Sequence, residues 1–545
     1  MSGLLTGIRR GTLDWDLLRP FPAPDPAELA AADDAATDLT VLLDGLLDPD
    51  DADLTRTLPP QLVPSLAAKG FLRLTLPELD GGLGLGPFGM FRTLAAASGR
   101  SAAVGLLLAV HNALSLPAYL PVLPPGPLRD LVLARLADGT VFGVADTEPA
   151  GAANTARNTV AVPTADGRGY LLTGEKTFIG NGRIAGLLAV TATVLDTGPE
   201  RVDLFVVDTA AEGFSVAAAH DFLGLAGAPS AALRLDGVFV PAHRVLVTTD
   251  GGWRSSPAVT GINALARMCI TVAPAAAIAR SCVGWTRDFL GRRAIDGRPL
   301  AGYEAVRRRA AASAAELFAL DSVVRWCLLG PGDRTPEMVS AKNIGTVLAW
   351  RVAERTMSLF GAEGYETATS KARRGVPPVP LERALRDVRG LRIAGGVDFS
   401  VDLRSARGAI LPPYRSGELP PPGRPAAAAH PPGSALAPAA RYLDRQAHEF
   451  AVRCARLTRD STASELVERQ DTLITLSRLA DELFTMAVVL GRAGGPAETA
   501  LAETYCAHAR NRTAALCRVL DTPADDAHDR LGRAWLAGDL DHLLM

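Results

Sequence analysis

The sequence has little that points to a metal site, a disulfide framework or nucleic-acid binding. Its six cysteines form no CxxC pair, and its eight histidines form no HExxH motif or His/Cys cluster. The net charge of −3 gives no basic surface for nucleic acid or an anionic membrane. We therefore expect buried free thiols, no metal, and a protein of the reducing cytoplasm.

A secretory leader and membrane-spanning segments are not predicted either. The N-terminal stretch MSGLLTGIRRGTLDWDLL lacks a long apolar core and a small-residue cleavage site. No uninterrupted apolar run is long enough to cross a bilayer. What is present is an ordinary globular composition, 48% hydrophobic and 21% charged, in a chain of 545 residues that is too long for one core.

The pattern along the chain predicts a mostly α-helical protein with a small central antiparallel β-domain. Stretches such as GLLLAVHNALSLPAYL carry apolar residues at helical spacing, whereas RVDLFVVDT and similar short runs are typical of strands. The predicted domains are a helical N-terminal domain (1–140), a β-domain (141–250), a helical bundle (251–410), a Pro/Ala-rich linker (411–438) and a C-terminal helical domain (439–545).

Seven motifs follow one another in a specific order between Leu62 and Leu411. They are GFLRLTLPELDGGLGL, VADTEPAG, LLTGEKTFIGNG, LDGVFVPAHRVL, GRRAIDG, LFGAEGY and LERALRDVR. In this order they resemble the motifs of the acyl-CoA dehydrogenase family. The later stretches ERQDTLITLSRLADELFTMAVVLGRA and ETYCAHARNRTAALCRVL are similar to the extra helical domain of the very-long-chain branch of that family.

This resemblance implies both a fold and an activity. The fold would comprise a helical N-terminal domain, a β-barrel-like middle domain, a four-helix-bundle domain and the extra C-terminal helices. The resemblance also implies FAD as cofactor, an acyl thioester of coenzyme A or of a carrier protein as substrate, and a homodimer. In the family reaction a carboxylate takes the α-proton, and the β-hydrogen leaves as hydride to the flavin.

The same resemblance assigns residues to an FAD site. Thr147 corresponds to the threonine that binds the pyrimidine edge of the flavin, and Phe178 to the aromatic residue beside the ring. Arg293, with Arg292 as the alternative, corresponds to the arginine that reaches the FAD of a neighbouring subunit. The other assigned positions are Ala152, Ala153, Gly180, Gly361, Gly364 and Val397.

Several of these positions lack the group that the family uses. Ala152 and Ala153 stand where the family has a Gly-Ser pair, Gly180 where a hydroxyl reaches the flavin, and Val397 where a threonine contacts FAD. These replacements predict weak or lost FAD binding. The segment FIGNG could alternatively serve only as a hairpin turn, which Asn-Gly favours.

The predicted acid–base site has lost its base. Gly395 occupies the position of the catalytic glutamate, and Ala266 occupies the alternative base position that some branches use, next to Arg267. The loss of a positioned base typically costs about 10²–10⁴-fold in rate. Asp398, three residues beyond Gly395, is a substitute candidate if that stretch is helical. Arg267 is a candidate for substrate binding.

Three functions are compatible with this pattern. The first is a FAD-dependent acyl-CoA dehydrogenase-like enzyme without the usual base. The second is a catalytically inactive homologue, a pseudo-enzyme that acts as a structural or hetero-oligomeric partner. The third is a flavin-dependent monooxygenase on the same fold.

Overall fold

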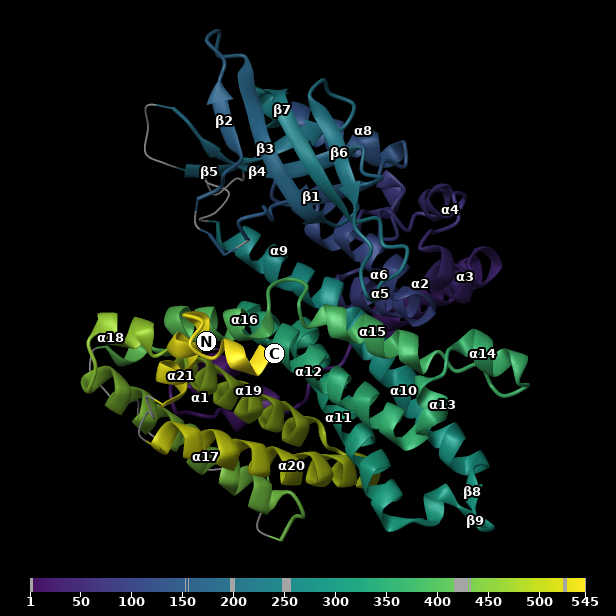
Figure 1. The fold of residues 1–545 in the computed structure, drawn as a ribbon, viewed down its shortest axis with the longest axis vertical. Helices are drawn as coiled ribbons and strands as arrows, with labels where there is room; N and C mark the ends of the chain where they lie inside the picture. Colours follow the sequence, from purple (N-terminus) through teal and green to yellow (C-terminus); the bar gives the residue numbers. More distant parts are fainter. Residues whose placement is uncertain are drawn as a thin grey trace.

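The computed structural model describes residues 3–151, 153–154, 156–196, 201–247, 256–415, 430, 433–522 and 527–544. Ala152 and most of the predicted linker lie outside these residues. In Figure 1 the β-domain and the N-terminal helices form the upper part of the molecule, and two helical groups lie side by side below them. The fold is mostly helical, as predicted.

The N-terminal helices pack against one another next to the sheet. They are α2 (Pro26–Leu46), α3 (Pro49–Thr55), α4 (Leu62–Ala68), α5 (Pro87–Arg100), α6 (Ala102–Ala109), α7 (Leu116–Tyr119) and α8 (Pro127–Ala137). Asp25 and Ser101 cap α2 and α6, because their side chains accept hydrogen bonds from backbone N–H groups of the first helical turn. A π-helical turn, η3 (Val110–Leu114), follows α6 directly.

The central sheet is mixed rather than purely antiparallel. Its strands are β1 (Phe142–Ala145), β2 (Val160–Pro163), β3 (Gly169–Ile179), β4 (Leu187–Val194), β5 (Arg201–Asp208), β6 (Phe214–Ala219) and β7 (Ala231–Pro241). Their order is β1-β4-β2-β3-β7-β6, with β5 on β4. The pairs β1–β4 and β2–β4 are parallel, which corrects the antiparallel prediction. Every residue of β4 is buried, as in strands covered on both faces.

The helical bundle contains two long helices of 26 residues each, α11 (Glu304–Leu329) and α12 (Thr335–Phe360). It also contains α9 (Pro257–Arg267), α10 (Ala273–Arg292) and α15 (Leu381–Leu391), with the shorter α13 (Ala362–Tyr365), α14 (Ala368–Arg373) and α16 (Asp398–Ser405). A second π-helical turn, η5 (Met268–Val272), joins α9 to α10. The hairpin β8–β9 (Ala294–Ile295 and Arg298–Pro299) follows α10.

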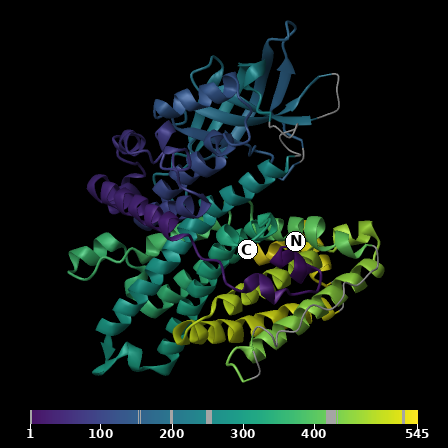
Figure 2. The same ribbon diagram turned by 180° about the vertical axis from the view of Figure 1, so that it is seen from behind.

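The C-terminal helices surround α19 (Gln470–Arg492), most of which is buried. The others are α17 (Ala437–Arg459), α18 (Ala463–Glu468), α20 (Pro496–Asp521) and α21 (Ala527–Leu536). The first helix of the chain, α1 (Leu4–Arg9), packs against α17 and α19, and Figure 2 shows it among these C-terminal helices. The predicted N-terminal domain 1–140 therefore starts with a segment that lies apart from the other N-terminal helices.

The interior explains two features of the sequence. All six cysteines are free, and five of them are buried, as expected for thiols in helical cores. Two helical stretches, Ala102–Tyr119 and Pro257–Arg292, are long and apolar enough to cross a membrane, although the sequence predicted none. They are 83% and 78% buried inside the protein, so their apolarity is accounted for by core packing.

Candidate functional site

The loop that carries Thr147 is fixed by the residues on both sides of it. Asp146 accepts hydrogen bonds from Arg157, at 2.9 Å from its Nη2, and from the Thr191 hydroxyl at 2.7 Å. The backbone oxygen of Thr147 accepts a hydrogen bond from Thr177 in β3 at 2.9 Å. The half-buried Thr147 hydroxyl has no hydrogen bond within the part of the chain that the structure describes, which leaves it free for a ligand.

Glu148 anchors the other side of this loop. It receives hydrogen bonds from Lys176 Nζ at 2.8 Å and from the backbone N–H groups of Asn158 and Thr159 at 2.6 and 2.9 Å. Burial opposes the ionised form of Glu148, but these hydrogen bonds outweigh burial and lower the pKa of its carboxyl to about 2. The Lys176–Glu148 pair is completely buried and paired, so its role is to hold the loop rigid.

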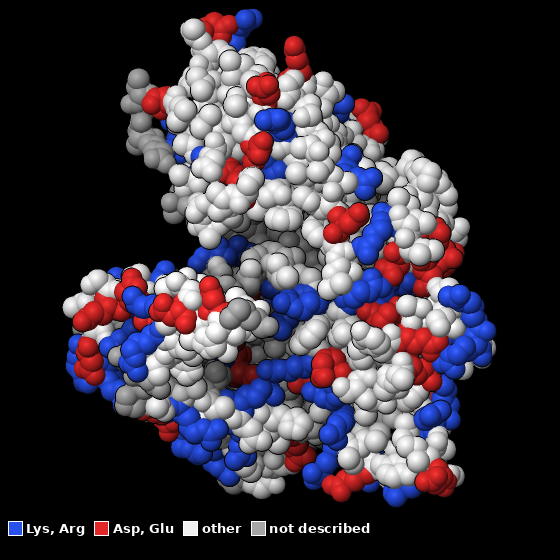
Figure 3. Space-filling model, viewed as in Figure 1, with Lys and Arg blue, Asp and Glu red and all other residues white. Residues whose placement is uncertain are grey.

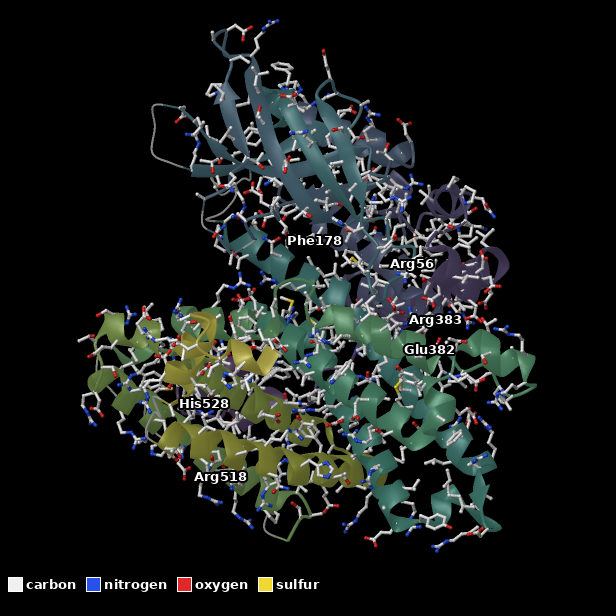
Figure 4. The ribbon with its side chains drawn as sticks, in the orientation of Figure 1. Arg56, Phe178, Glu382, Arg383, Arg518 and His528 are labelled. Atoms are coloured by element: carbon white, nitrogen blue, oxygen red, sulfur yellow. The ribbon has the colours of Figure 1, made fainter. Side chains whose placement is uncertain are left out.

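Phe178 projects from the end of β3 rather than packing into the sheet. Its backbone φ is +57°, a left-handed conformation that bulky residues rarely adopt, and its side chain is 60% exposed. Figure 4 shows Phe178 at the lower edge of the β-domain, beside the helical part of the molecule. An exposed aromatic face at the meeting point of two domains is suited to stack against a planar cofactor.

His220 supports Phe178, although no motif singled this histidine out. The His220 Nε2 atom accepts a hydrogen bond from the backbone N–H of Phe178 at 3.1 Å and lies 3.2 Å from the Thr177 hydroxyl. The ring centroids of His220 and Phe178 lie 4.9 Å apart. His220 follows β6 and is 42 residues from Phe178 in the chain, so only the pairing of β3, β7 and β6 brings the two together.

Gly180 is pressed against the π-helical turn η3. A Cβ atom at Gly180 would lie 3.1 Å from a methyl group of Val110. The neighbouring Asn181 fixes this arrangement, because its Nδ2 donates to the backbone oxygens of Leu107 and Phe142, both at 3.0 Å. A hydroxyl-bearing residue at this position would therefore require Val110 to shift by a few tenths of an ångström.

Gly395 faces the second π-helical turn. Its φ is +68°, and a Cβ there would lie 3.6 Å from Arg267 Cγ, 3.7 Å from Thr271 Cγ2 and 3.8 Å from Ile270 Cδ1. Burial, followed by the charge of Arg404, lowers the pKa of Arg267. Within the described residues no carboxylate forms an ion pair with Arg267. The three described atoms nearest to a side chain at Gly395 are thus carbon atoms of Arg267, Thr271 and Ile270, and none belongs to a carboxylate.

Asp398 is not one helical turn beyond Gly395, and it is paired with another residue. Gly395 and Gly396 both have positive φ, and α16 begins only at Asp398, so the stretch between them is not a helical turn. Asp398 forms an ion pair with Arg392 and accepts a hydrogen bond from the Phe399 N–H. Burial opposes its ionised form, but these contacts prevail and lower the pKa of Asp398. The substitute predicted from sequence spacing is thereby engaged elsewhere.

Two polar side chains of α12 hold the loop before α16 in place. Lys342, which is fully buried, donates from Nζ to the backbone oxygens of Arg392 at 2.9 Å and Gly396 at 2.5 Å. Asn343 donates to the backbone oxygen of Asp398 at 2.9 Å. Burial lowers the pKa of Lys342 to about 8. Polar groups of α12 therefore fix the direction in which Gly395 faces.

The two candidate arginines have different environments. Arg292 pairs with Glu363, which lies in the turn between Gly361 and Gly364. Arg293 is exposed beside the hairpin β8–β9, and it has no ion pair within the described part of the chain. Only Arg293 is thus available to a molecule outside this chain. Gly361 has φ +61°, and a Cβ at Gly364 would come within 2.9 Å of Phe360 Cβ, so both glycines are required by the turn.

The remaining predicted site residues differ in burial and in the elements that carry them. Ala266 is completely buried in α9, and Val397 is the residue before α16. Ala153 is exposed in the loop after β1, whereas Ala152 is outside the described residues. The described residues contain no cluster of His, Cys, Asp or Glu that could hold a metal ion, and no metal was predicted.

Models of a single protein family match the chain in three consecutive segments. Residues 45–122, 143–238 and 257–400 match the N-terminal, middle and C-terminal domains of acyl-CoA dehydrogenase. A probable acyl-CoA dehydrogenase of Mycobacterium tuberculosis, FadE10, is 30% identical over 407 residues, which are 73% of this chain and 62% of that protein. The chain thus spans somewhat less than two thirds of the length of this curated relative.

Two further comparisons include the C-terminal helices. The human very long-chain specific acyl-CoA dehydrogenase is 24% identical and covers 93% of this chain and 82% of its own length. The structure of an acyl-CoA dehydrogenase from Bacillus anthracis, complexed with FAD, covers 90% of this chain and 88% of its own, with a TM-score of 0.75 and 19% identity. Butyryl-CoA dehydrogenase of Megasphaera elsdenii covers only 70% of this chain and 97% of its own, with a TM-score of 0.60 and 20% identity. The chain belongs to the acyl-CoA dehydrogenase family.

Proposed function

We propose that this protein is a FAD-dependent acyl-thioester oxidoreductase that has lost the positioned base of its family. The observation that carries this proposal is the environment of Gly395, where the three nearest described atoms belong to Arg267, Thr271 and Ile270 and not to a carboxylate. The family membership supports FAD and an acyl thioester of coenzyme A as ligands. A homodimer in the cytoplasm remains our prediction.

The residues around Phe178 fit FAD. The Thr147 hydroxyl is free to bind a polar edge of the ring, and the exposed face of Phe178 can stack against it. Bound FAD would supply a hydride acceptor. The missing hydroxyl at Gly180 removes one hydrogen bond to the cofactor, and Val110 packs closely against this position. We therefore expect FAD to bind, with fewer hydrogen bonds than in relatives that carry the hydroxyl.

The protein groups on the Gly395 side can bind and orient a substrate but cannot take its α-proton. The aliphatic part of Arg267 lies beside the Gly395 position, with Cγ 3.6 Å from a Cβ there, and an arginine stays protonated at any physiological pH. The α-proton must then leave to water or to a group on the substrate. The absent base predicts a rate about 10²–10⁴-fold below that of an equivalent protein with a positioned carboxylate.

The test compares the wild type with Gly395→Glu and its matched control Gly395→Gln. A left-handed side chain costs roughly 1–2 kcal/mol at this position in either variant, but the surrounding atoms leave room for a Cβ. Each protein is loaded with FAD, and flavin reduction by palmitoyl-CoA is followed by absorbance. We expect slow reduction in the wild type and in Gly395→Gln, and at least tenfold faster reduction in Gly395→Glu.

A second candidate function is an inactive partner of an active homologue. The replacements at Gly180, Gly395 and Val397 favour this candidate, whereas the exposed Arg293, which forms no ion pair within the described residues, could reach a neighbouring subunit in either candidate. This function is favoured if the wild type takes up no FAD and Gly395→Glu gains no activity. Stoichiometric FAD in the wild type, together with a gain in the glutamate variant, would eliminate it.

A further inference from the structure

A cavity of about 470 Å³ lies between α12 of the bundle and helices α19 and α20 of the C-terminal domain. Figure 3 shows this face of the molecule hollowed between the two helical groups, with acidic and basic side chains around the hollow. Arg392 and Asp398 line it, whereas Gly395 in the same segment faces Arg267 and Thr271. The cavity is therefore on the opposite side of this segment from the predicted acid–base site.

The middle of the cavity is apolar and elongated. Its apolar walls are Ile344, Val347 and Leu348 of α12, and Ala515, Leu516 and Val519 of α20. Along α12 the lining extends from Asn343 to Arg351, about 12 Å at the ~1.5 Å rise of an α-helix. An extended chain of roughly ten carbon atoms spans this distance, given a C–C bond of ~1.5 Å.

A loosely held cation lies at one end of the cavity. Arg351 approaches Glu316 and Glu482 only to 3.9 Å, and it makes no hydrogen bond within the described residues. Glu482 is already satisfied by Arg512, at 2.7 and 2.9 Å. Arg351 thus keeps its N–H donors for an anion, and the neighbouring carboxylate is neutralised by another arginine.

A buried carboxyl group with a free oxygen lies toward the other end. Asp481 is 7% exposed, and its Oδ1 has no hydrogen-bond partner within the described residues. Burial, reinforced by the charge of Asp402, raises the pKa of Asp481 to about 8, so this group is neutral at pH 7. A neutral carboxyl group can donate and accept hydrogen bonds, and an unpaired buried oxygen is costly unless a ligand or water reaches it.

The charges around the cavity sum to one positive charge at pH 7. Four arginines line it, namely Arg351, Arg392, Arg478 and Arg512. Three lining carboxylates are ion-paired with them, namely Asp398, Asp402 and Glu482. Since Asp481 is neutral, an anionic ligand is favoured over a cationic one.

We propose that this cavity binds a medium-chain carboxylate of roughly ten carbon atoms, with a hydroxyl or carbonyl at its far end. The carboxylate pairs with Arg351, the alkyl body lies along Val347 and Leu516, and the far polar group bonds Asp481. Such a ligand contacts Arg392 and Asp398, and so it touches the segment that carries Gly395. This site does not depend on FAD or on the proposed oxidoreductase activity.

Isothermal titration calorimetry on the whole protein, with 10-hydroxydecanoate and decanoate as probes, tests this proposal. We expect 10-hydroxydecanoate to bind about fivefold tighter than decanoate, as one additional hydrogen bond provides. Arg351→Gln should weaken both probes at least tenfold. Arg308→Gln, an exposed arginine that is paired with Glu304 on α11, is the matched control and should change neither.

A second variant separates this cavity from any other site for fatty carboxylates. Val347→Trp fills the middle of the cavity and should abolish binding of both probes, provided that circular dichroism shows the variant folded. If it does not fold, Arg351→Gln alone decides the question. The proposal is wrong if the wild type binds neither probe, if Arg351→Gln binds them as the wild type does, or if the hydroxyl gives no advantage.

Discussion

The motifs assign no role to His220 or Asp481, two residues that shape the predicted site and the proposed cavity. His220 supports the strained Phe178 backbone through a hydrogen bond at 3.1 Å and ring contact. Asp481 is a buried acid between the bundle and the C-terminal helices. Both owe their roles to neighbours that are distant in the sequence.

Replacement of His220 should weaken FAD binding without unfolding the protein. His220→Ala removes the acceptor for the Phe178 N–H and the ring beside Phe178, a loss of about 1–2 kcal/mol or roughly tenfold in affinity. His220→Gln keeps an acceptor at a similar position and should bind FAD within about threefold of the wild type. Quenching of flavin fluorescence on titration of the apoprotein measures this.

A histidine elsewhere on the β-domain provides the control for this experiment. His243→Ala replaces an exposed histidine just after β7 and should leave FAD affinity unchanged. If His220→Ala and His243→Ala bind FAD equally well, then His220 does not position Phe178. Equal losses in His220→Ala and His220→Gln would instead assign the effect to ring packing alone.

The raised pKa of Asp481 predicts that Asp481→Asn stabilises the protein at alkaline pH. The folded protein holds this proton up to a pKa of about 8, whereas an unfolded chain releases it near the ordinary value of 3.8. Between these values the folded state binds more protons, so stability falls as pH rises. Asn carries no charge, and its advantage over Asp should therefore grow from pH 5 to pH 8.

Urea unfolding of both proteins at the two pH values measures this difference. The charged neighbours of Asp481 are Asp402, Arg9 and Glu482, and they are unchanged in the variant. Asp529→Asn, at an exposed acid paired with Arg533 on α21, is the control and should show no such pH dependence. A constant difference between Asp481→Asn and the wild type from pH 5 to pH 8 would contradict the raised pKa.

At the scale of elements, periodicity and turn residues predicted the helices and strands, but not the pairing of the strands. The buried run LLAVTATV of β4 reads as a strand, and nothing in it shows that β1 and β2 lie parallel to it. Strand order depends on contacts between distant segments, which local pattern does not encode. The motifs, by contrast, identified the family, because seven of them follow one another in a specific order along the chain.

The candidate site, like the order of the strands, depends on contacts that the local sequence pattern does not encode. The sequence predicts that a carboxylate is missing at Gly395, but it does not give the direction of the neighbouring side chains. The helical spacing that suggested Asp398 failed because two residues with positive φ precede α16. The π-helical turns η3 and η5 contact each other and face Gly180 and Gly395. Each adds a residue to a helical turn, as often occurs at functional sites, and no residue pattern announces them.

At the scale of the whole molecule, the two ends of the chain differ in how much they contribute to the stability of the folded protein. The N-terminal segment buries Leu4, Leu5, Ile8, Trp15 and Leu18 almost completely. Arg9 donates to Ser340 of α12 at 3.1 Å and to Ser405 of α16 at 2.8 Å. The segment therefore joins the bundle to the C-terminal helices. In contrast, none of the described residues of α21 is buried.

Deletion of residues 2–18 should therefore destabilise the molecule, whereas deletion of residues 527–545 should not. Each buried apolar side chain contributes roughly 1.5–3 kcal/mol, and without Arg9 the buried Asp481 loses its nearby cation. Differential scanning calorimetry should show a melting temperature lowered by more than about 5 °C for the N-terminal deletion. The C-terminal deletion should melt within about 1 °C of the wild type, since surface groups usually contribute little. Equal melting temperatures for the two deletions would mean that the N-terminal segment does not hold the bundle and the C-terminal helices together.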